Sequence, residues 1–189
     1  MLNGYRNPSR ESRMHSGVAS RGSVRISFTC ASLNSAYVWA CGIQNSYLQV
    51  PTTEKYYGVC SQEFGLENSG KVVIIRRAVC DRKVDSMEFR NNLRSCMEHI
   101  GFTPCLADPD VWTRPVTKAN GQEHYEYVLI FTDDDRVVSD EAEHIIRNQI
   151  GKYFVTKKES IDQPNRHLGG SVRKILLDSM AEAWLFSSS

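Results

Sequence analysis

Residues 125–138 read Tyr-Glu-Tyr-Val-Leu-Ile-Phe-Thr-Asp-Asp-Asp-Arg-Val-Val. The β-branched and aromatic residues up to Phe131 predict a strand, the aspartates predict a tight turn, and Arg136-Val137-Val138 predicts a second short strand. Adjacent carboxylates at the tip of such a hairpin, here Asp133 and Asp134, can hold divalent metal ions against a triphosphate. The alternative interpretation of an aspartate run is an ordinary solvent-exposed turn.

The composition is that of one globular domain. The 189 residues are 41% hydrophobic and 24% charged, and the formal net charge of +1 indicates neither a nucleic-acid-binding nor a membrane-binding protein. There is no targeting signal and no apolar run long enough to span a membrane. The six cysteines are scattered without a Cys-x-x-Cys pair, which indicates reduced thiols rather than a zinc site. We therefore expect a soluble intracellular protein, cytoplasmic or nuclear, with no membrane partner.

Two clusters of basic residues stand out from this neutral background. Arginines crowd the N-terminal 25 residues, and Arg76, Arg77, Arg82 and Lys83 form the second cluster. Such clusters can follow a phosphate backbone, and they are equally typical of a solvated surface.

Periodicity divides the chain into a polar segment over residues 1–22, with little structure of its own, and a folded domain over residues 23–189. Helices are predicted over Met87–Ile100, over Asp140–Ile150, and over Val24–Leu33 with Ser23 as cap and Ile26, Cys30 and Leu33 on the inward face. Strands are predicted over Tyr37–Cys41, Val72–Ile75, Val111–Arg114, Tyr153–Lys157, Ser171–Leu177 and Ala183–Phe186, and residues 51–70 are predicted to be loop with short extended pieces. This order predicts an α+β, split βαβ sheet with helices on one face.

Five short motifs occur in an order typical of one family. They are Ile43-Gln44-Asn45-Ser46-Tyr47-Leu48, Arg77-Ala78-Val79 with Lys83, Ala107-Asp108-Pro109-Asp110-Val111-Trp112, Phe131-Thr132-Asp133-Asp134 and Leu168-Gly169-Gly170. From about Gly17 to Ser189 the chain thereby resembles the reverse transcriptase domain of copia-type LTR retrotransposons. The resemblance implies an antiparallel, ferredoxin-like polymerase palm, RNA-directed DNA synthesis, Mg²⁺ as cofactor, and an RNA or DNA template-primer as partner.

The resemblance also implies a metal site that this chain does not complete. In such a palm, two hairpin carboxylates, here Asp133 and Asp134, and one carboxylate at the end of the first strand hold two Mg²⁺ ions. The third carboxylate belongs five residues before the aromatic residue that screens the incoming sugar. Tyr47 is that aromatic residue, and the residue five positions earlier is Gly42. Lys83 corresponds to a nucleotide-binding lysine.

Nothing nearby replaces the missing carboxylate, because no Asp or Glu lies between Glu11 and Glu54. We therefore expect weak or absent metal binding and a catalytically inactive, degenerate palm with fingers and thumb largely missing. One alternative is a non-catalytic nucleic-acid- or protein-binding domain derived from a retrotransposon, whose two basic clusters would converge on one face. Another is an unrelated metal-binding ferredoxin-like domain.

Overall fold

The computed structural model describes residues 17–78, 83–167, 170–178 and 182–187, without the side chains of residues 53–55, 83–85 and 167. The described chain divides into two compact units. The first comprises residues 45–94, and the second comprises residues 17–44 together with residue 95 onward. The boundary between them falls within helix α2 (Lys83–His99).

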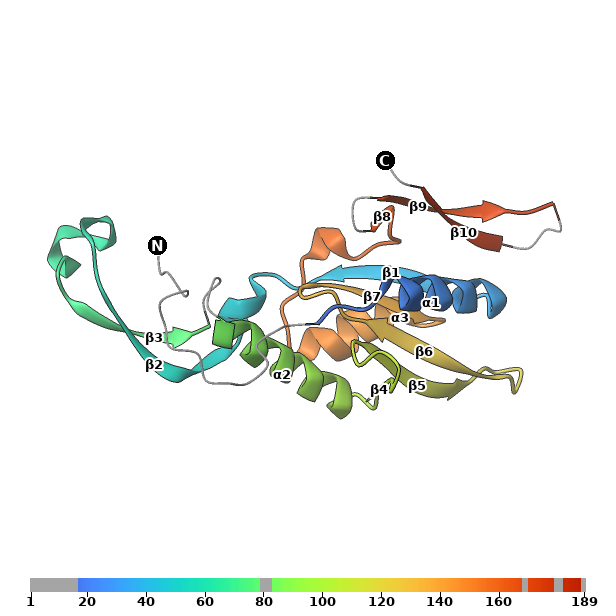
Figure 1. Cartoon of the computed structure of the whole chain (residues 1–189), viewed down its shortest axis with the longest axis horizontal. Coiled ribbons are helices and arrows are strands. Elements are labelled where there is room, and N and C mark those ends of the chain that lie inside the picture. The colour runs from blue at the N-terminus through green and yellow to red at the C-terminus, as the bar shows by residue number, and fades with distance from the viewer. Residues whose placement is uncertain (1–16, 79–82, 168–169, 179–181, 188–189) are drawn as a thin grey trace. The chain divides into compact units, whose positions relative to one another are not determined.

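An antiparallel sheet of five strands forms the centre of the second unit (Figure 1). In spatial order the strands are β1 (Tyr37–Gly42), β7 (Asp134–Ser139), β6 (Glu123–Leu129), β5 (Val111–Thr117) and β4 (Thr103–Pro104). Because β7 is antiparallel to both of its neighbours, β1 and β6 run parallel to each other on either side of it. The α+β class, the antiparallel pairing and the aspartate hairpin predicted from the sequence are all confirmed.

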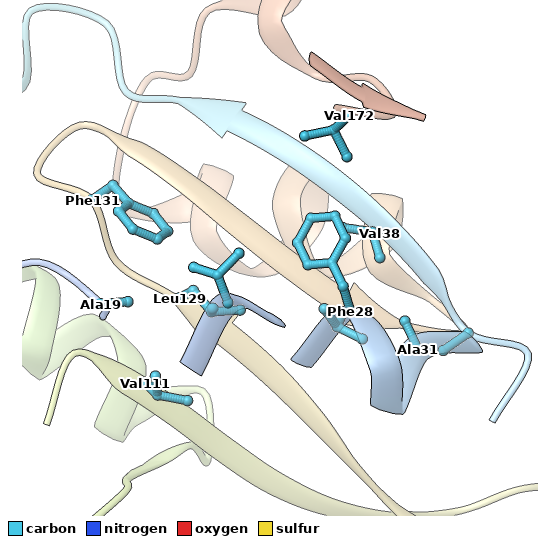
Figure 2. Packing of buried hydrophobic residues seen from close by; sticks show 11 residues of the cluster. Ala19, Phe28, Ala31, Val38, Val111, Leu129, Phe131 and Val172 are labelled. Carbon is cyan, nitrogen blue, oxygen red and sulfur yellow. The ribbon is translucent and has the colours of Figure 1, made fainter. Parts of the chain in front are cut away.

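Helix α1 (Arg21–Leu33) packs on one face of this sheet through Val24, Phe28 and Ala31 (Figure 2). The predicted inward face was wrong, since Ile26 and Leu33 are 64% and 79% exposed. The helix carries apolar residues on two stripes, and the sheet covers the stripe that contains the larger Phe28 side chain.

The cap of α1 also differs from the prediction. Ser20 is the N-cap, and its side chain accepts a hydrogen bond from the Ser23 backbone N–H at 3.1 Å. Ser23 instead donates its hydroxyl to Asp108, 2.6 Å away, within the first turn of the helix. The helix therefore begins three residues earlier than Val24, because a serine satisfies the free N–H groups of the turn that follows it.

The chain after β7 covers the opposite face of the sheet. It forms α3 (Ala142–His144), a π-helical turn (Ile145–Gln149) and a 3-10 turn (Ile150–Lys152). Gln149 accepts a hydrogen bond at 3.1 Å from Arg114 of β5, which is ion-paired with Glu126 of β6. Side chains alternate between the two faces along a strand, so Leu129, three residues after Glu126 on β6, points to the other face and packs in the cluster that contains α1.

Helices thus lie on both faces of the sheet, and the prediction of helices on one face was wrong. The reason is visible in β7, where the consecutive residues Val137 and Val138 are both buried. Successive strand residues point to opposite faces, so each face of this sheet needs an apolar cover. The apolar residues of the helix predicted over Asp140–Ile150, which are Ala142, Ile145, Ile146 and Ile150, are all buried.

A separate three-stranded sheet, β10 (Glu182–Ser187), β9 (Gly170–Leu176) and β8 (Arg166–His167), adds to the core around α1. Trp184 and Phe186 pack edge-on against Phe28, with ring centroids 5.1 and 5.0 Å away. Both predicted C-terminal strands are therefore confirmed. The predicted strand over Tyr153–Lys157 is not formed, because that segment makes only a single bridge between Thr156 and Ile43.

The first unit contains an antiparallel pair of strands, β2 (Pro51–Val59) and β3 (Val72–Arg77). Two short 3-10 turns, Gln62–Phe64 and Leu66–Asn68, follow β2. The prediction of loop with short extended pieces over residues 51–70 is confirmed for its second half. Its extended part, strand β2, is longer than predicted, because it pairs with β3. The apolar spacing of the helix predicted over Met87–Ile100 places Phe89, Leu93, Cys96, Met97 and Ile100 on one face. The first four are buried in the structure, and Ile100 is half-buried.

Candidate metal centre at the aspartate turn

The turn between β6 and β7 lies beside the end of β1, as the sequence predicted. Gly42 is the register partner of Asp134. One residue further on, the Ile43 N–H donates a 2.7 Å hydrogen bond to the Asp133 carbonyl oxygen. Within the turn, the Asp134 N–H donates to the Phe131 carbonyl at 3.1 Å. These bonds hold the two aspartates against the strand end where the resemblance expects a third carboxylate.

The space beside Gly42 is already filled. A Cβ atom built on Gly42 would lie 2.9 Å from Ser160 Oγ, 3.1 Å from Lys157 Cδ and 3.2 Å from Asp134 Oδ1. The segment with Lys157 and Ser160 is hydrogen-bonded to the same glycine. The Gly42 N–H donates to Ser160 Oγ at 2.7 Å, and the Gly42 carbonyl accepts from the Lys157 N–H at 2.8 Å. A side chain at position 42 would therefore have to displace its neighbours.

Lys157 supplies a positive charge to the turn. Its Nζ atom lies 3.7 Å from Asp133 Oδ2, and the two side chains are 37% and 41% exposed. Neither Lys157 nor Ser160 was among the site residues predicted from the sequence. No local signal could have found them, because Ser160 is 118 residues away from Gly42, the residue it contacts.

The third carboxylate of the run differs sharply from the other two. Asp135 is fully buried and is the register partner of Cys41. Its Oδ1 accepts a long hydrogen bond, 3.4 Å, from the Phe131 N–H, and its Oδ2 has no partner among the described residues. Burial raises the pKa of Asp135 to about 8, because the charged form loses its hydration.

The buried thiols near Asp135 are affected in the same way. Burial, with a smaller contribution from the Asp135 charge, raises the pKa of Cys41 and of Cys96 to about 12. Metal ligation requires deprotonated thiols and carboxylates. At neutral pH, Asp135, Cys41 and Cys96 are therefore protonated and are not available as metal ligands.

The residues around the turn do not fit a two-metal centre. Two Mg²⁺ ions need a carboxylate from the neighbouring strand in addition to the turn carboxylates, and here Gly42, Ser160 and Lys157 occupy that place. Within the described residues, no group of three or more His, Cys, Asp or Glu side chains is arranged to hold a metal ion.

Of the other two predicted site residues, the structure describes the side chain of Tyr47. Tyr47 belongs to the first unit, where its ring packs against Phe89 with centroids 5.6 Å apart. Arg77 of β3 donates to the Gln49 carbonyl at 2.9 Å. The Lys83 side chain lies outside the described residues, as do Arg82, the N-terminal arginines up to Arg13, and Leu168-Gly169.

Comparison with known proteins adds no family to these observations. No family model and no curated protein matches the chain. The described helices include none whose length and apolar character would allow it to cross a membrane.

Proposed function

We propose that this chain is a degenerate reverse transcriptase palm of the copia type, and that it does not synthesise DNA. The pairing of Gly42 with Asp134 carries this proposal. A palm needs the end of its first strand and its aspartate hairpin side by side, and here those two elements are neighbours. The parallel relation of β1 and β6 around β7, together with the five ordered motifs, gives further support.

The inactivity follows from the charges at the turn. Nucleotidyl transfer in this mechanism uses two metal ions. One ion activates the attacking hydroxyl, the other stabilises the leaving group, and shared carboxylates hold the two ions together. Asp133 and Asp134 come from a single turn, and Lys157 offsets part of their charge. Without a carboxylate at position 42, the second ion has no ligand shared with the first.

Restoring that carboxylate tests the palm assignment directly. Gly42→Asp combined with Ser160→Ala removes the closest obstructing atom, Ser160 Oγ, and adds the missing ligand. The matched control is Gly42→Asn with Ser160→Ala, which has the same size without the charge. With Mn²⁺ as probe, we expect the aspartate variant to bind a pair of ions with the exchange-coupled electron paramagnetic resonance signal of ions about 4 Å apart. The same spectrum, or no pair, in both variants would refute a palm metal site at this position.

Primer extension on an RNA template, with Mg²⁺ or Mn²⁺, tests the inactivity. We expect no extension by the natural chain. We also expect no extension by Gly42→Asp alone, because the new side chain would clash with Ser160 and Lys157 and could not take the position of a metal ligand. Extension by the natural chain would show that a carboxylate at position 42 is dispensable.

A further inference from the structure

We propose that Lys157 is a tethered cation that occupies the aspartate turn in place of a divalent ion and opposes the binding of one. Its ammonium group is 3.7 Å from Asp133 Oδ2, on the side of the turn that faces Gly42. The competition depends only on the charges at the turn, so it would operate whatever the ancestry of the domain.

The backbone around Lys157 is fixed on both sides. The Lys157 N–H donates to the Gly42 carbonyl at 2.8 Å. The Lys157 carbonyl accepts from Ser160 twice, from the hydroxyl at 2.7 Å and from the backbone N–H at 3.0 Å. These hydrogen bonds hold the backbone of Lys157 at the end of β1, so its side chain starts next to the aspartate turn.

The glycine opens the route for the lysine side chain. Lys157 Cδ lies 3.1 Å from the position that a Cβ atom of residue 42 would take, which is closer than nine in ten contacts of real Cβ atoms. The absence of a side chain at Gly42 thus has two effects on this turn. It leaves position 42 without a charge, and it lets the aliphatic part of the Lys157 side chain pass close to the strand towards Asp133.

Coulomb's law sets the size of the competition. The two turn aspartates and Lys157 together carry one net negative charge, whereas the aspartates alone would carry two. A divalent ion about 5 Å from the ammonium group is repelled, in a water-like dielectric at ordinary ionic strength, enough to weaken binding on the order of tenfold. Because the Lys157 side chain is partly exposed, a larger effect is not expected.

Lys158 provides a matched control in the same segment. It carries the same charge as Lys157, and it is exposed. Lys157→Met and Lys158→Met remove the same charge from the protein, and both keep a flexible, unbranched side chain. Only the first removes the ammonium group that is paired with Asp133.

The experiment is a titration of the full chain with Mn²⁺ alone, with free ion measured by electron paramagnetic resonance. We expect Lys157→Met to bind Mn²⁺ on the order of tenfold more tightly than the natural chain, and Lys158→Met less than about twofold more tightly. Lys157→Arg, which keeps the charge, should bind like the natural chain. Adding Asp133→Asn to Lys157→Met should remove the gain.

Three results would overturn the inference. They are equal gains in the two methionine variants, no gain in Lys157→Met with its circular dichroism unchanged, and a tenfold gain in Lys157→Arg. If Lys157→Met does not fold, Lys157→Gln takes its place, because it also removes the ammonium group, and the same gain in Mn²⁺ binding is expected. The two proposals can fail separately. If Lys157→Met binds Mn²⁺ more tightly but Gly42→Asp with Ser160→Ala binds no pair of Mn²⁺ ions, Lys157 is supported as the competing cation and the palm metal site is refuted.

Discussion

Replacing Asp135 by valine should make this protein more stable, and the gain should grow as the pH rises. Asp135 lies in the interior on β7, and its Oδ2 has no hydrogen-bond partner among the described residues. Burial raises its pKa from 3.8 to about 8, so the folded protein must hold a proton that the unfolded chain has released. A raised carboxyl pKa makes stability highest at low pH, and that stability is lost as the pH rises towards the folded value.

The shift gives the size of the effect. Between the two pKa values, the free energy of unfolding falls by about 1.4 kcal/mol per pH unit, which amounts to roughly 3 kcal/mol from pH 5 to pH 7. The cost of keeping Asp135 protonated at about pH 7 is roughly 4 kcal/mol on this scale. Valine loses the weak bond from the Phe131 N–H, worth about 1 kcal/mol. The expected net gain is roughly 3 kcal/mol at about pH 7, and below about 1 kcal/mol at about pH 5.

Urea unfolding followed by circular dichroism, at several pH values and with EDTA present, measures this difference. Comparing Asp135→Val with the natural chain at each pH cancels the titration of all other groups. Asp135→Asn removes the same titration while nearly keeping the shape, so its curve should also lack the fall between pH 5 and pH 7. Asp134→Asn, at the neighbouring exposed position, should stay parallel to the natural chain. Parallel curves for Asp135→Val and the natural chain would refute a buried, protonated Asp135.

Three further substitutions test other parts of the fold by urea unfolding. Thr132 has a φ of 62°, which disfavours a β-branched residue, so Thr132→Gly should stabilise the turn by roughly 0.5–1 kcal/mol; a loss would show that the threonine side chain stabilises it. Ser20→Ala removes the cap of α1 and should cost about 1 kcal/mol, whereas an unchanged midpoint would place the cap elsewhere. Glu126→Ala removes the ion-pair partner of Arg114 and the hydrogen-bond acceptor of the Ser139 hydroxyl, and should cost roughly 3 kcal/mol; the same loss in an Arg114→Met background would mean that the ion pair does not contribute.

Elements defined by their own residues were predictable from the sequence. The apolar spacing of Met87–Ile100 specifies an amphipathic helix, and the run that ends in three aspartates specifies a hairpin. Even the pairing of the Tyr37–Cys41 strand with that hairpin was predicted, because the resemblance requires the two to be neighbours. In each case the decisive information lies within about fifteen consecutive residues or in a known motif order.

Where the local sequence allows two structures equally well, only tertiary contacts determine which one forms. Helix α1 carries two apolar stripes, and the sheet rather than the helix determined that Phe28 points inward and Leu33 outward. Strand β2 has the composition of a loop and becomes extended because β3 pairs with it. Local periodicity contains no information about such a partner.

The sequence by itself determined that this turn carries three carboxylates and that position 42 carries none. Only the tertiary structure decided what those facts mean for the site. The register of β7 with β1 turns Asp135 into the interior, where burial keeps it protonated, and leaves Asp133 and Asp134 at the surface. A segment more than a hundred residues after Gly42 fills the space that the glycine leaves, and brings an ammonium group to the turn. The charge and solvation of a group depend on which distant atoms surround it, and those neighbours are assigned by packing rather than by residue type.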